Sequence, residues 1–335
     1  MRAMNLLVTG GFGFIGSNFI RYMLSTYNDI KIINLDKIGI GANPSNLKEF
    51  EGDKRYLFIR GDVCNYELLS KLIRKVDFVI NFAAETHVDR SISNPENFIN
   101  NNTIGTFTIL EAIRREKPKT KLIHISTDEV YGDILEGSFK EEDRLKPSNP
   151  YSASKAAADM FVLAYRRTYD LDATIVRPTN NFGPYQFPEK LIPKTIIRAS
   201  MNLKIPVYGK GENIRDWIYV IDTCRAIDLI INEDKKEEIY NISAGNEIKN
   251  IDLIKRLLKI MNKSENLITF VEDRPGHDMR YSLDSSKIRA LGWRPIHTLN
   301  EALEKTVKWY IENDWWWKPL AKEHIIHPTP WKLKW

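Results

Sequence analysis

Short apolar runs with β-strand character alternate with longer segments of helical periodicity over the first 180 residues of the chain. The apolar runs lie at residues 5–8, 30–35, 57–59, 76–82, 122–125 and 174–177, and helical patterns lie at 17–24, 98–113 and 156–165. This alternation predicts an α/β fold with a doubly wound parallel sheet of the Rossmann type. Ligands of such sheets bind at the carboxyl ends of the strands, so we expect the chemistry in the loops there.

The pattern changes at residues 178–185, which are rich in turn formers and side-chain amides and predict a domain boundary. Helical patterns follow at 191–201, 220–232, 251–261 and 299–309, with an irregular stretch at 205–219 and a returning strand at 238–242. We therefore predict a Rossmann domain over residues 1–180, with a return segment near 217–243, and a smaller C-terminal substrate-binding domain over 181–335. The aromatic end of the chain, at 315–317 and 324–335, is expected to pack onto its own domain or onto a partner subunit.

The first apolar run leads directly into a glycine-rich turn and then into a helical pattern. Gly10, Gly13 and Gly16 form G-x-x-G-x-x-G, in which glycine lets the backbone approach a pyrophosphate at a helix N-terminus. The second run leads into Asp36, twenty residues past Gly16, where a carboxylate would hydrogen-bond the ribose of NAD and repel the extra phosphate of NADP. The pattern predicts an NAD site; the alternative is a tight turn beside an unrelated surface aspartate.

The loops after the next two strands complete the predicted cofactor site. Asp62 follows the third run at a place suited to the adenine, and the small residues Ala83 and Ala84 would let the cofactor pass close to the backbone. His87, in the same loop as the two alanines, is expected to reach a substrate hydroxyl or else to stabilise its loop. The full predicted cofactor set is Gly10, Gly13, Phe14, Ile15, Gly16, Asp36, Asp62, Val63, Ala83, Ala84, Asn102, Tyr151 and Lys155.

Two further stretches carry candidate acid-base chemistry. Tyr151 and Lys155 lie one turn apart on a predicted helix, and an ammonium about 5.4 Å along the axis would lower the pKa of the phenol from its reference value of about 10. Asp128 and Glu129 follow Thr127 after the apolar run 122–125. Because neighbours on a strand face opposite ways, these three side chains can converge only if the chain has left the strand by Asp128, and we expect a helical turn there. The alternative for the two acids is a helix N-terminus whose dipole they complement.

The composition of the chain limits which kinds of binding partner we expect. The 335 residues include 49 Lys and Arg against 44 Asp and Glu, with the two signs interspersed, which favours an acidic small ligand over nucleic acid. Cys64 and Cys224 are too few for a disulfide framework and lack metal-ligand spacing, so we expect buried thiols, no metal and a reduced, cytoplasmic setting. No apolar stretch reaches the roughly 18 residues of a membrane span, and residues 1–9 do not resemble a signal peptide, so we expect no membrane partner.

Seven sequence elements together resemble the extended short-chain dehydrogenase/reductases, and among them the dTDP-glucose 4,6-dehydratases. They are T-G-G-F-G-F-I-G (9–16), A-E-T-H-V-D-R-S-I (84–92), S-T-D-E-V-Y-G (126–132), Y-S-A-S-K (151–155), R-P-T-N-N-F-G-P-Y-Q (177–186), R-D-W-I-Y-V (215–220) and D-R-P-G-H-D-M-R-Y (273–281). The resemblance runs from about residue 5 to about residue 320. No function is carried over to the last fifteen residues.

The resemblance implies an NAD-dependent lyase that converts dTDP-glucose to dTDP-4-keto-6-deoxyglucose and water, with a hydride taken from C4 and returned to C6. Tyr151 would be the base at the C4 hydroxyl, assisted by Lys155, with Thr127 on the same oxygen. Glu129 would be the base at C5 and Asp128 the acid at C6. Because two carboxylates with different tasks must differ in pKa, we predict that Asp128 is the more buried and is protonated when substrate binds.

The resemblance also implies a substrate site, with the diphosphate on two arginines. That set is His87, Thr127, Asn181, Lys190, Pro206, Tyr208, Arg215, Asn250, Arg274 and His277. Arginine forks suit phosphate oxygens, although Arg215 could instead lie on a solvated face near Asp216. A homodimer through the helices at 98–113 and 151–168 is expected, with Ala156, Ala157, Ala158 and Ala164 allowing close packing.

Three other functions stay open at this point. A nucleotide-sugar 4-epimerase needs no proton abstraction at C5 and no water loss, so the consecutive Asp128 and Glu129 argue against it. A dehydratase of a UDP or CDP sugar stays open as well, because the nucleobase is recognised by loop geometry and not by a short sequence motif. A non-catalytic NAD-binding regulator would not need Thr127, Tyr151 and Lys155 together.

Overall fold

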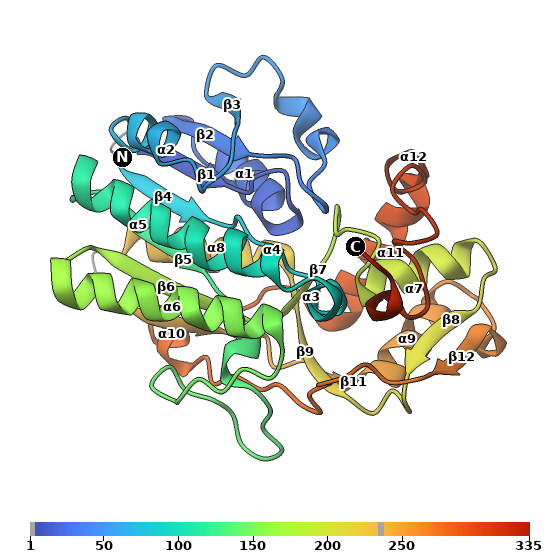
Figure 1. Ribbon diagram of the computed structural model, residues 1–335. Helices are drawn as coiled ribbons and strands as arrows, with labels where there is room; N and C mark the ends of the chain where they lie inside the picture. The colour runs from blue at the N-terminus through green and yellow to red at the C-terminus, as the bar shows by residue number, and fades with distance from the viewer. Residues whose placement is uncertain (1–3, 234–237) are drawn as a thin grey trace.

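A seven-stranded parallel sheet is the main element of the fold, in a computed structural model that describes residues 4–233 and 238–335. The predicted ranges that include residues 1–3 and 234–237 extend outside this part. The strand order is β10-β6-β5-β4-β1-β2-β3 (Figure 1), so the doubly wound sheet predicted from the sequence is confirmed. The strands are β1 (Met4–Thr9), β2 (Ile30–Asp36), β3 (Tyr56–Arg60), β4 (Phe78–Asn81), β5 (Lys121–Ile125), β6 (Ala173–Pro178) and β10 (Ile239–Ile242).

The inner strands are apolar at successive positions because both faces of the sheet are covered. In β1, Leu6 and Val8 point into one core, while Leu7 between them points into the other. All three side chains are fully buried. A parallel strand buried on both faces therefore appears in the sequence as a continuous apolar run.

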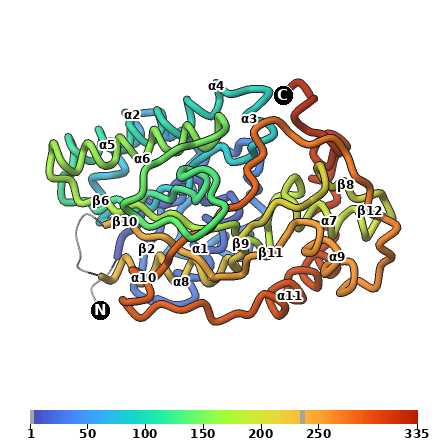
Figure 2. The backbone as a smooth tube through the Cα atoms, turned by 90° about the horizontal axis from the view of Figure 1, so that it is seen from below, coloured from blue at the N-terminus to red at the C-terminus, as the bar shows by residue number. Residues whose placement is uncertain are grey.

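Helices cover both faces of the sheet and give the three layers seen in Figure 2. One face carries α1 (Phe14–Thr26), α8 (Val220–Asn232) and α10 (Ser286–Ala290), and the other carries α2 (Tyr66–Ile73), α5 (Gly105–Glu116) and α6 (Pro150–Tyr169). The predicted return of the chain is visible in α8, which packs on α1, and in β10, which pairs with β6. The chain comes back once more at α10, which contacts β10.

The rest of the chain after β6 gathers beside the sheet, on the right in Figure 1. Its strands form a three-stranded sheet, β11-β9-β7, and a parallel pair, β12-β8. These strands are β7 (Asn180–Phe182), β8 (Ile205–Tyr208), β9 (Ile214–Tyr219), β11 (Glu247–Lys249) and β12 (Ile268–Val271), and the helices around them are α7 (Leu191–Ser200), α9 (Asn250–Ile260), α11 (Leu299–Glu312) and α12 (Asp314–Trp317). Trp316 and Trp317 are buried in this part's own core, so the tryptophan cluster packs onto its own chain as expected.

Short elements complete the chain. They are η1 (Pro44–Phe50), α3 (Val88–Ser93), α4 (Glu96–Phe98), the π-turn η2 (Ile99–Ile104), the 3-10 turns η3 (Asp128–Tyr131) and η4 (Glu265–Leu267), and η5 (Pro330–Lys332). Across the described ranges, no helix has the length and apolar character needed to cross a membrane. Cys224 is buried as expected, but the prediction is wrong for Cys64, which is exposed in the loop after β3.

Candidate active site

Two cavities meet where the carboxyl ends of the sheet strands face the second part of the chain. The first, of about 270 Å³, is lined by the ends of β1, β2, β4, β5 and β6. The second, of about 170 Å³, is lined by α3, α7, β8, β9 and the loop that follows β12. The cavities share Thr86, Glu129, Asn180, Asn181, Gln186, Glu189 and Lys190, so they form one continuous site.

A cradle of glycines forms one wall of the first cavity. Gly10 has φ +69°, and a Cβ there would lie 2.7 Å from the backbone of Ala83 in the loop after β4. A Cβ on Gly16 would lie 2.5 Å from the carbonyl oxygen of Gly10. Helix α1 begins after Gly13 without a side-chain cap, which leaves its first N–H groups to face an anion. The cradle fits the pyrophosphate of a dinucleotide.

Asp36 ends β2 at the rim of the same cavity. Its carboxylate accepts hydrogen bonds from the backbone N–H of Phe12, at 2.9 Å, and of Ile38, at 2.7 Å. Burial raises the pKa of Asp36, and these two donors oppose the shift. The bond to Ile38 also holds that residue at φ +61°, which a β-branched side chain disfavours. The loop is thus fixed in a shape that holds the Asp36 carboxylate at the edge of the cavity.

Most residues predicted to bind the cofactor line this cavity, but Asn102 and Asp62 do not. Asn102 is fully buried behind the wall, where its amide accepts from the N–H of Glu85 and donates to the Glu85 carbonyl and to Ser154. Asn101 lines the cavity in its place, because the π-turn η2 alters the helical register here. Asp62 bonds to the N–H of Cys64 and pairs with a lysine at the surface. Both side chains position the loops of the cavity.

The stretch that follows β5 turns inward as predicted. Thr127 is extended and caps the single 3-10 turn η3, with its hydroxyl accepting from the N–H of Glu129 at 3.3 Å. The same hydroxyl donates to Asp128 Oδ1 at 3.1 Å. All three side chains line the first cavity, so the predicted helical turn is confirmed. Because this four-residue turn directs both acids into a cavity, a favourable interaction with a helix dipole does not by itself account for them.

The two consecutive carboxylates differ in burial. Asp128 is 3 % exposed, and burial together with the charge of Glu129 raises its pKa to about 8. Glu129 is half-buried, and burial raises its pKa as well, although Arg274 and Arg215 oppose the shift. The prediction that Asp128 is the more buried is confirmed. At neutral pH the structure therefore holds Asp128 in its protonated form.

Tyr151 and Lys155 lie on α6 and line the first cavity, but their electrostatics differ from the prediction. Lys155 donates to the carbonyl of Ile125 on β5 at 2.7 Å, and burial lowers its pKa to about 8. Burial and the charge of Glu129 raise the pKa of Tyr151, while a hydrogen bond with Thr127 lowers it. The net shift of the Tyr151 pKa in this structure is therefore upward, whereas the prediction expected Lys155 to lower it. The ammonium donates to the strand, and the charge of Glu129 acts on the phenol.

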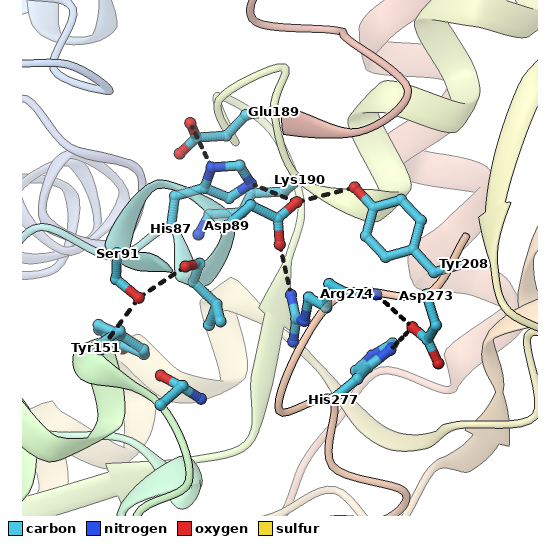
Figure 3. A network of polar contacts seen from close by, with 12 residues as sticks. His87, Asp89, Ser91, Tyr151, Glu189, Lys190, Tyr208, Asp273, Arg274 and His277 are labelled. Carbon is cyan, nitrogen blue, oxygen red and sulfur yellow. Dashed lines mark hydrogen bonds and ion pairs between the residues drawn. The ribbon is translucent and has the colours of Figure 1, made fainter. Parts of the chain in front are cut away.

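The predicted substrate residues come together around the second cavity. Thr127 lines only the first cavity, Asn181 and Lys190 line both, and the others line the second: His87, Pro206, Tyr208, Arg215, Asn250, Arg274 and His277. Figure 3 shows Asp89 at their centre, accepting from Tyr208 Oη and from Arg274 Nη1, each at 2.9 Å. Arg274 is thus held in the wall by a carboxylate that the prediction did not include.

Arg215 is buried and held by main-chain oxygens. It donates to the carbonyls of Ile214, at 2.7 Å, and Asp278, at 2.9 Å, and its guanidinium lies 4.2 Å from the ring centroid of Tyr281. The carboxylate of Asp216 bonds instead to Ser243 and to the turn at 245–246. The alternative that Arg215 lies on a solvated face is therefore wrong.

Glu189, like Asp89, is a site residue that the sequence reasoning missed. It is 3 % exposed, lines both cavities, pairs with Arg90 at 3.1 Å and lies 3.3 Å from His87. A carboxylate directly before Lys190, at the start of a predicted helix, was the available signal. No group of three His, Cys, Asp or Glu side chains in the described ranges is arranged to hold a metal ion.

Comparison with known proteins gives a consistent result. The family model described as GDP-mannose 4,6 dehydratase matches residues 7–306. A probable dTDP-glucose 4,6-dehydratase of Sinorhizobium fredii is 44% identical, with 95% of each chain covered. The dTDP-glucose 4,6-dehydratase DesIV of Streptomyces venezuelae, crystallised with NAD and TYD, matches at a TM-score of 0.92 and 44% identity over 95% of this chain and all of that one. A UDP-glucuronic acid 4-epimerase of Bacillus cereus matches at 0.87 and 29% identity, over 92% of this chain and 99% of that one.

Proposed function

The chain belongs to the GDP-mannose 4,6-dehydratase family, and we propose that it is an NAD-dependent lyase converting dTDP-glucose to dTDP-4-keto-6-deoxyglucose and water. One observation carries the reaction type. Asp128 and Glu129 are consecutive, both point into the cavity that holds Tyr151, and only Asp128 is fully buried. Water loss needs an acid at the leaving oxygen and a base at the neighbouring carbon, and this pair supplies both.

The glycine cradle, the uncapped N-terminus of α1 and the oriented Asp36 support NAD as the cofactor. When bound, NAD accepts a hydride from C4 of the hexose and returns it to C6, and its oxidised ring carries positive charge. The carboxylate of Asp36 would accept from ribose hydroxyls and would repel the additional phosphate of NADP. Lys155 would donate to the cofactor as well as to the carbonyl of Ile125.

Tyr151 removes the proton of the C4 hydroxyl, with Thr127 donating to the same oxygen. The raised pKa of Tyr151 means that the phenol stays protonated until a positive charge lies beside it. Oxidation at C4 would therefore wait until the cofactor is in place. The ketone formed at C4 makes the C5 proton acidic, which the next step requires.

Glu129 then takes the C5 proton, and Asp128 protonates the C6 oxygen as it leaves as water. Asp128 suits the acid role because burial and the charge of Glu129 raise its pKa to about 8. Glu129 is half-buried, with Arg215 and Arg274 favouring its charged form. The same geometry would return a proton to C5 from Glu129 when the hydride goes back to C6.

The second cavity is suited to a nucleoside diphosphate. Arg215 and Arg274 supply guanidinium groups in a mostly buried wall, where charge-assisted bonds to phosphate are strong. Pro206 and Tyr208 offer an apolar and an aromatic surface for a base. The amide oxygen of Asn250 is buried and has no hydrogen-bond partner among residues 4–233 and 238–335, so its side chain has capacity for a ligand. The proposed preference for thymine over uracil as the nucleobase rests on the similarity to the relatives.

A homodimer through α5 and α6 is the proposed assembly. These neighbouring helices expose a stripe of apolar side chains, namely Ile99 and Ile104 in η2, Phe107, Met160 and Phe161. Of the four alanines predicted to allow close packing, Ala156 and Ala158 point inward, so the large side chains dominate the stripe. Sedimentation should show a dimer for the wild type and a shift to monomer for Phe107→Glu, because a buried charge would replace an apolar contact. We also propose a cytoplasmic location, supported by two cysteines that are free thiols.

The test of function is incubation of the purified protein with dTDP-glucose, and in parallel with UDP-glucose, followed by the alkaline ultraviolet absorbance of a 4-keto-6-deoxy sugar. Signal with the thymidine sugar alone is the expected result. Signal with both sugars would keep the dehydratase and refute the preference for thymine. No signal, with NAD bound, would refute the dehydratase. Inversion of the sugar at C4 without water loss would then identify a 4-epimerase. If the sugar is not converted at all, the protein would be identified as a non-catalytic regulator.

A further inference from the structure

Residues 325–335, which we call the C-terminal strap, lie against the outer side of the substrate cavity. The matched family model ends at residue 306, so the strap is outside the region that defines the family. The C-terminus lies beside α3 in both Figure 1 and Figure 2, and the turn η5 within the strap packs on α3. Trp331, in η5, is only 8 % exposed. The strap is therefore a packed part of the fold.

On one side the strap binds the helix that carries the centre of the polar network. The side-chain amide of Asn94, the residue that ends α3, donates to the carbonyl of Trp335 at 3.3 Å. The guanidinium of Arg90 lies 5.8 Å from the ring centroid of Trp335. Arg90 in turn holds Glu189, which lines both cavities. One side of the strap thus fixes α3.

On its other side the strap binds the second part of the chain. Arg198 and Lys194 on α7 donate to the carbonyls of Ile326, at 2.7 Å, and His327, at 3.3 Å. The ring of Trp331 packs edge to face on Tyr208 at the end of β8, with centroids 4.7 Å apart. The strap therefore joins α3, which follows the loop after β4, to α7 and β8 across the substrate cavity.

The contacts continue inward from the strap to the reacting groups. Tyr208, which carries Trp331 on one side, donates to Asp89, and Asp89 accepts from Arg274. In the same helix, Ser91 Oγ accepts from the backbone N–H of Tyr151 at 3.2 Å (Figure 3). A shift of α3 would therefore move a proposed phosphate ligand and the proposed C4 base together.

We propose that the C-terminal strap is a positioning element of the substrate site, which fixes α3 against Tyr208 and so sets the affinity for the nucleotide without touching it. The inference rests on the proposed function for the identity of that nucleotide. It assigns to Trp331 a positioning role. The ring matters more than its apolar volume, because an edge-to-face pair holds the Tyr208 ring at one angle and so aims its hydroxyl at Asp89.

The test compares Trp331→Leu, which keeps apolar bulk and loses the ring, with Trp331→Phe, which keeps a ring. Trp315→Ala is the matched control, because Trp315 is 56 % exposed and its indole donates to Asn313, two residues away. Calorimetry would give the affinities for thymidine diphosphate and for NAD. We expect Trp331→Leu to bind the nucleotide about tenfold more weakly with NAD affinity unchanged, and Trp331→Phe and Trp315→Ala to match the wild type.

Hydrogen exchange of the same variants without nucleotide provides a second, independent reading. Faster exchange confined to α3 and β8 in Trp331→Leu is the expected result. The proposal is overturned if nucleotide affinity changes less than about twofold, if NAD affinity falls in parallel, or if exchange rises throughout the molecule. If the wild type itself does not bind thymidine diphosphate, the proposed function fails, and the exchange pattern alone decides the role of the strap.

Discussion

Replacing Asp128 by asparagine should lower the turnover of the enzyme and, at the same time, raise the free energy of unfolding of the protein. The side chain keeps its shape, and the amide oxygen can still accept from Thr127, as Asp128 Oδ1 does at 3.1 Å. What is lost is the proton for the C6 oxygen. General acid catalysis is worth roughly 10²- to 10⁴-fold, and we expect a loss of turnover in that range. In the proposed mechanism, oxidation at C4 depends on Tyr151 and not on this proton, so reduced nicotinamide should accumulate in a single turnover.

The stability effect follows from the raised pKa. Burial and the charge of Glu129 raise the pKa of Asp128 from 3.8 to about 8, so between these values the folded state binds a proton that the unfolded state releases. The cost that Asp128 adds to folding is therefore absent below the unfolded pKa and grows as pH rises toward the folded one. At about 1.36 kcal/mol per unit, the cost near neutral pH is about 4 kcal/mol. Asparagine does not titrate and removes that cost.

The assay is urea unfolding of wild type and Asp128→Asn at about pH 4 and about pH 7, alongside single-turnover measurement of reduced nicotinamide. Asp128→Asn should gain several kcal/mol near neutral pH and little in acid. Asp133→Asn is the control, since Asp133 is an exposed carboxylate nearby that lines neither cavity. An equal stability difference at the two pH values would refute the buried-proton reasoning. Turnover of Asp128→Asn within about tenfold of the wild type would refute its role as the acid.

Two further substitutions test the remaining assignments. Tyr151→Phe should bind NAD and nucleotide normally. It should form reduced nicotinamide from the sugar roughly 10²-fold more slowly or worse. A normal rate of formation in stopped flow would show that another group is the base at C4. Asp36→Asn should lose about 1.5–3 kcal/mol of NAD binding, the worth of a hydrogen bond to a charged group, and should gain affinity for NADP because the repulsion is gone. Calorimetry with both dinucleotides would measure this, and unchanged discrimination would place the selectivity elsewhere.

The sequence by itself determined the parts of this protein that depend on local rules. Leu6, Leu7 and Val8 must be buried on both faces of a sheet, and the alternation of such runs with helices left few other arrangements. Gly10 could be assigned to the cofactor cradle from the glycine motif between a strand and a helix, and in the structure no side chain fits where it lies. The turn at Asp128 could be predicted because three neighbouring side chains cannot converge from a straight strand.

Only the tertiary structure decided which groups touch and what charge they carry. Asn101 lines the cavity and Asn102 does not, because a π-turn shifts the helical register. The periodicity of apolar residues in the sequence does not predict that turn. The pKa of Tyr151 is raised because burial and Glu129 act on it, and both depend on how segments distant in sequence pack. The contact of Trp331 with Tyr208 joins residues more than a hundred positions apart. Periodicity and backbone limits are properties of short segments, whereas burial and distance are properties of the whole chain.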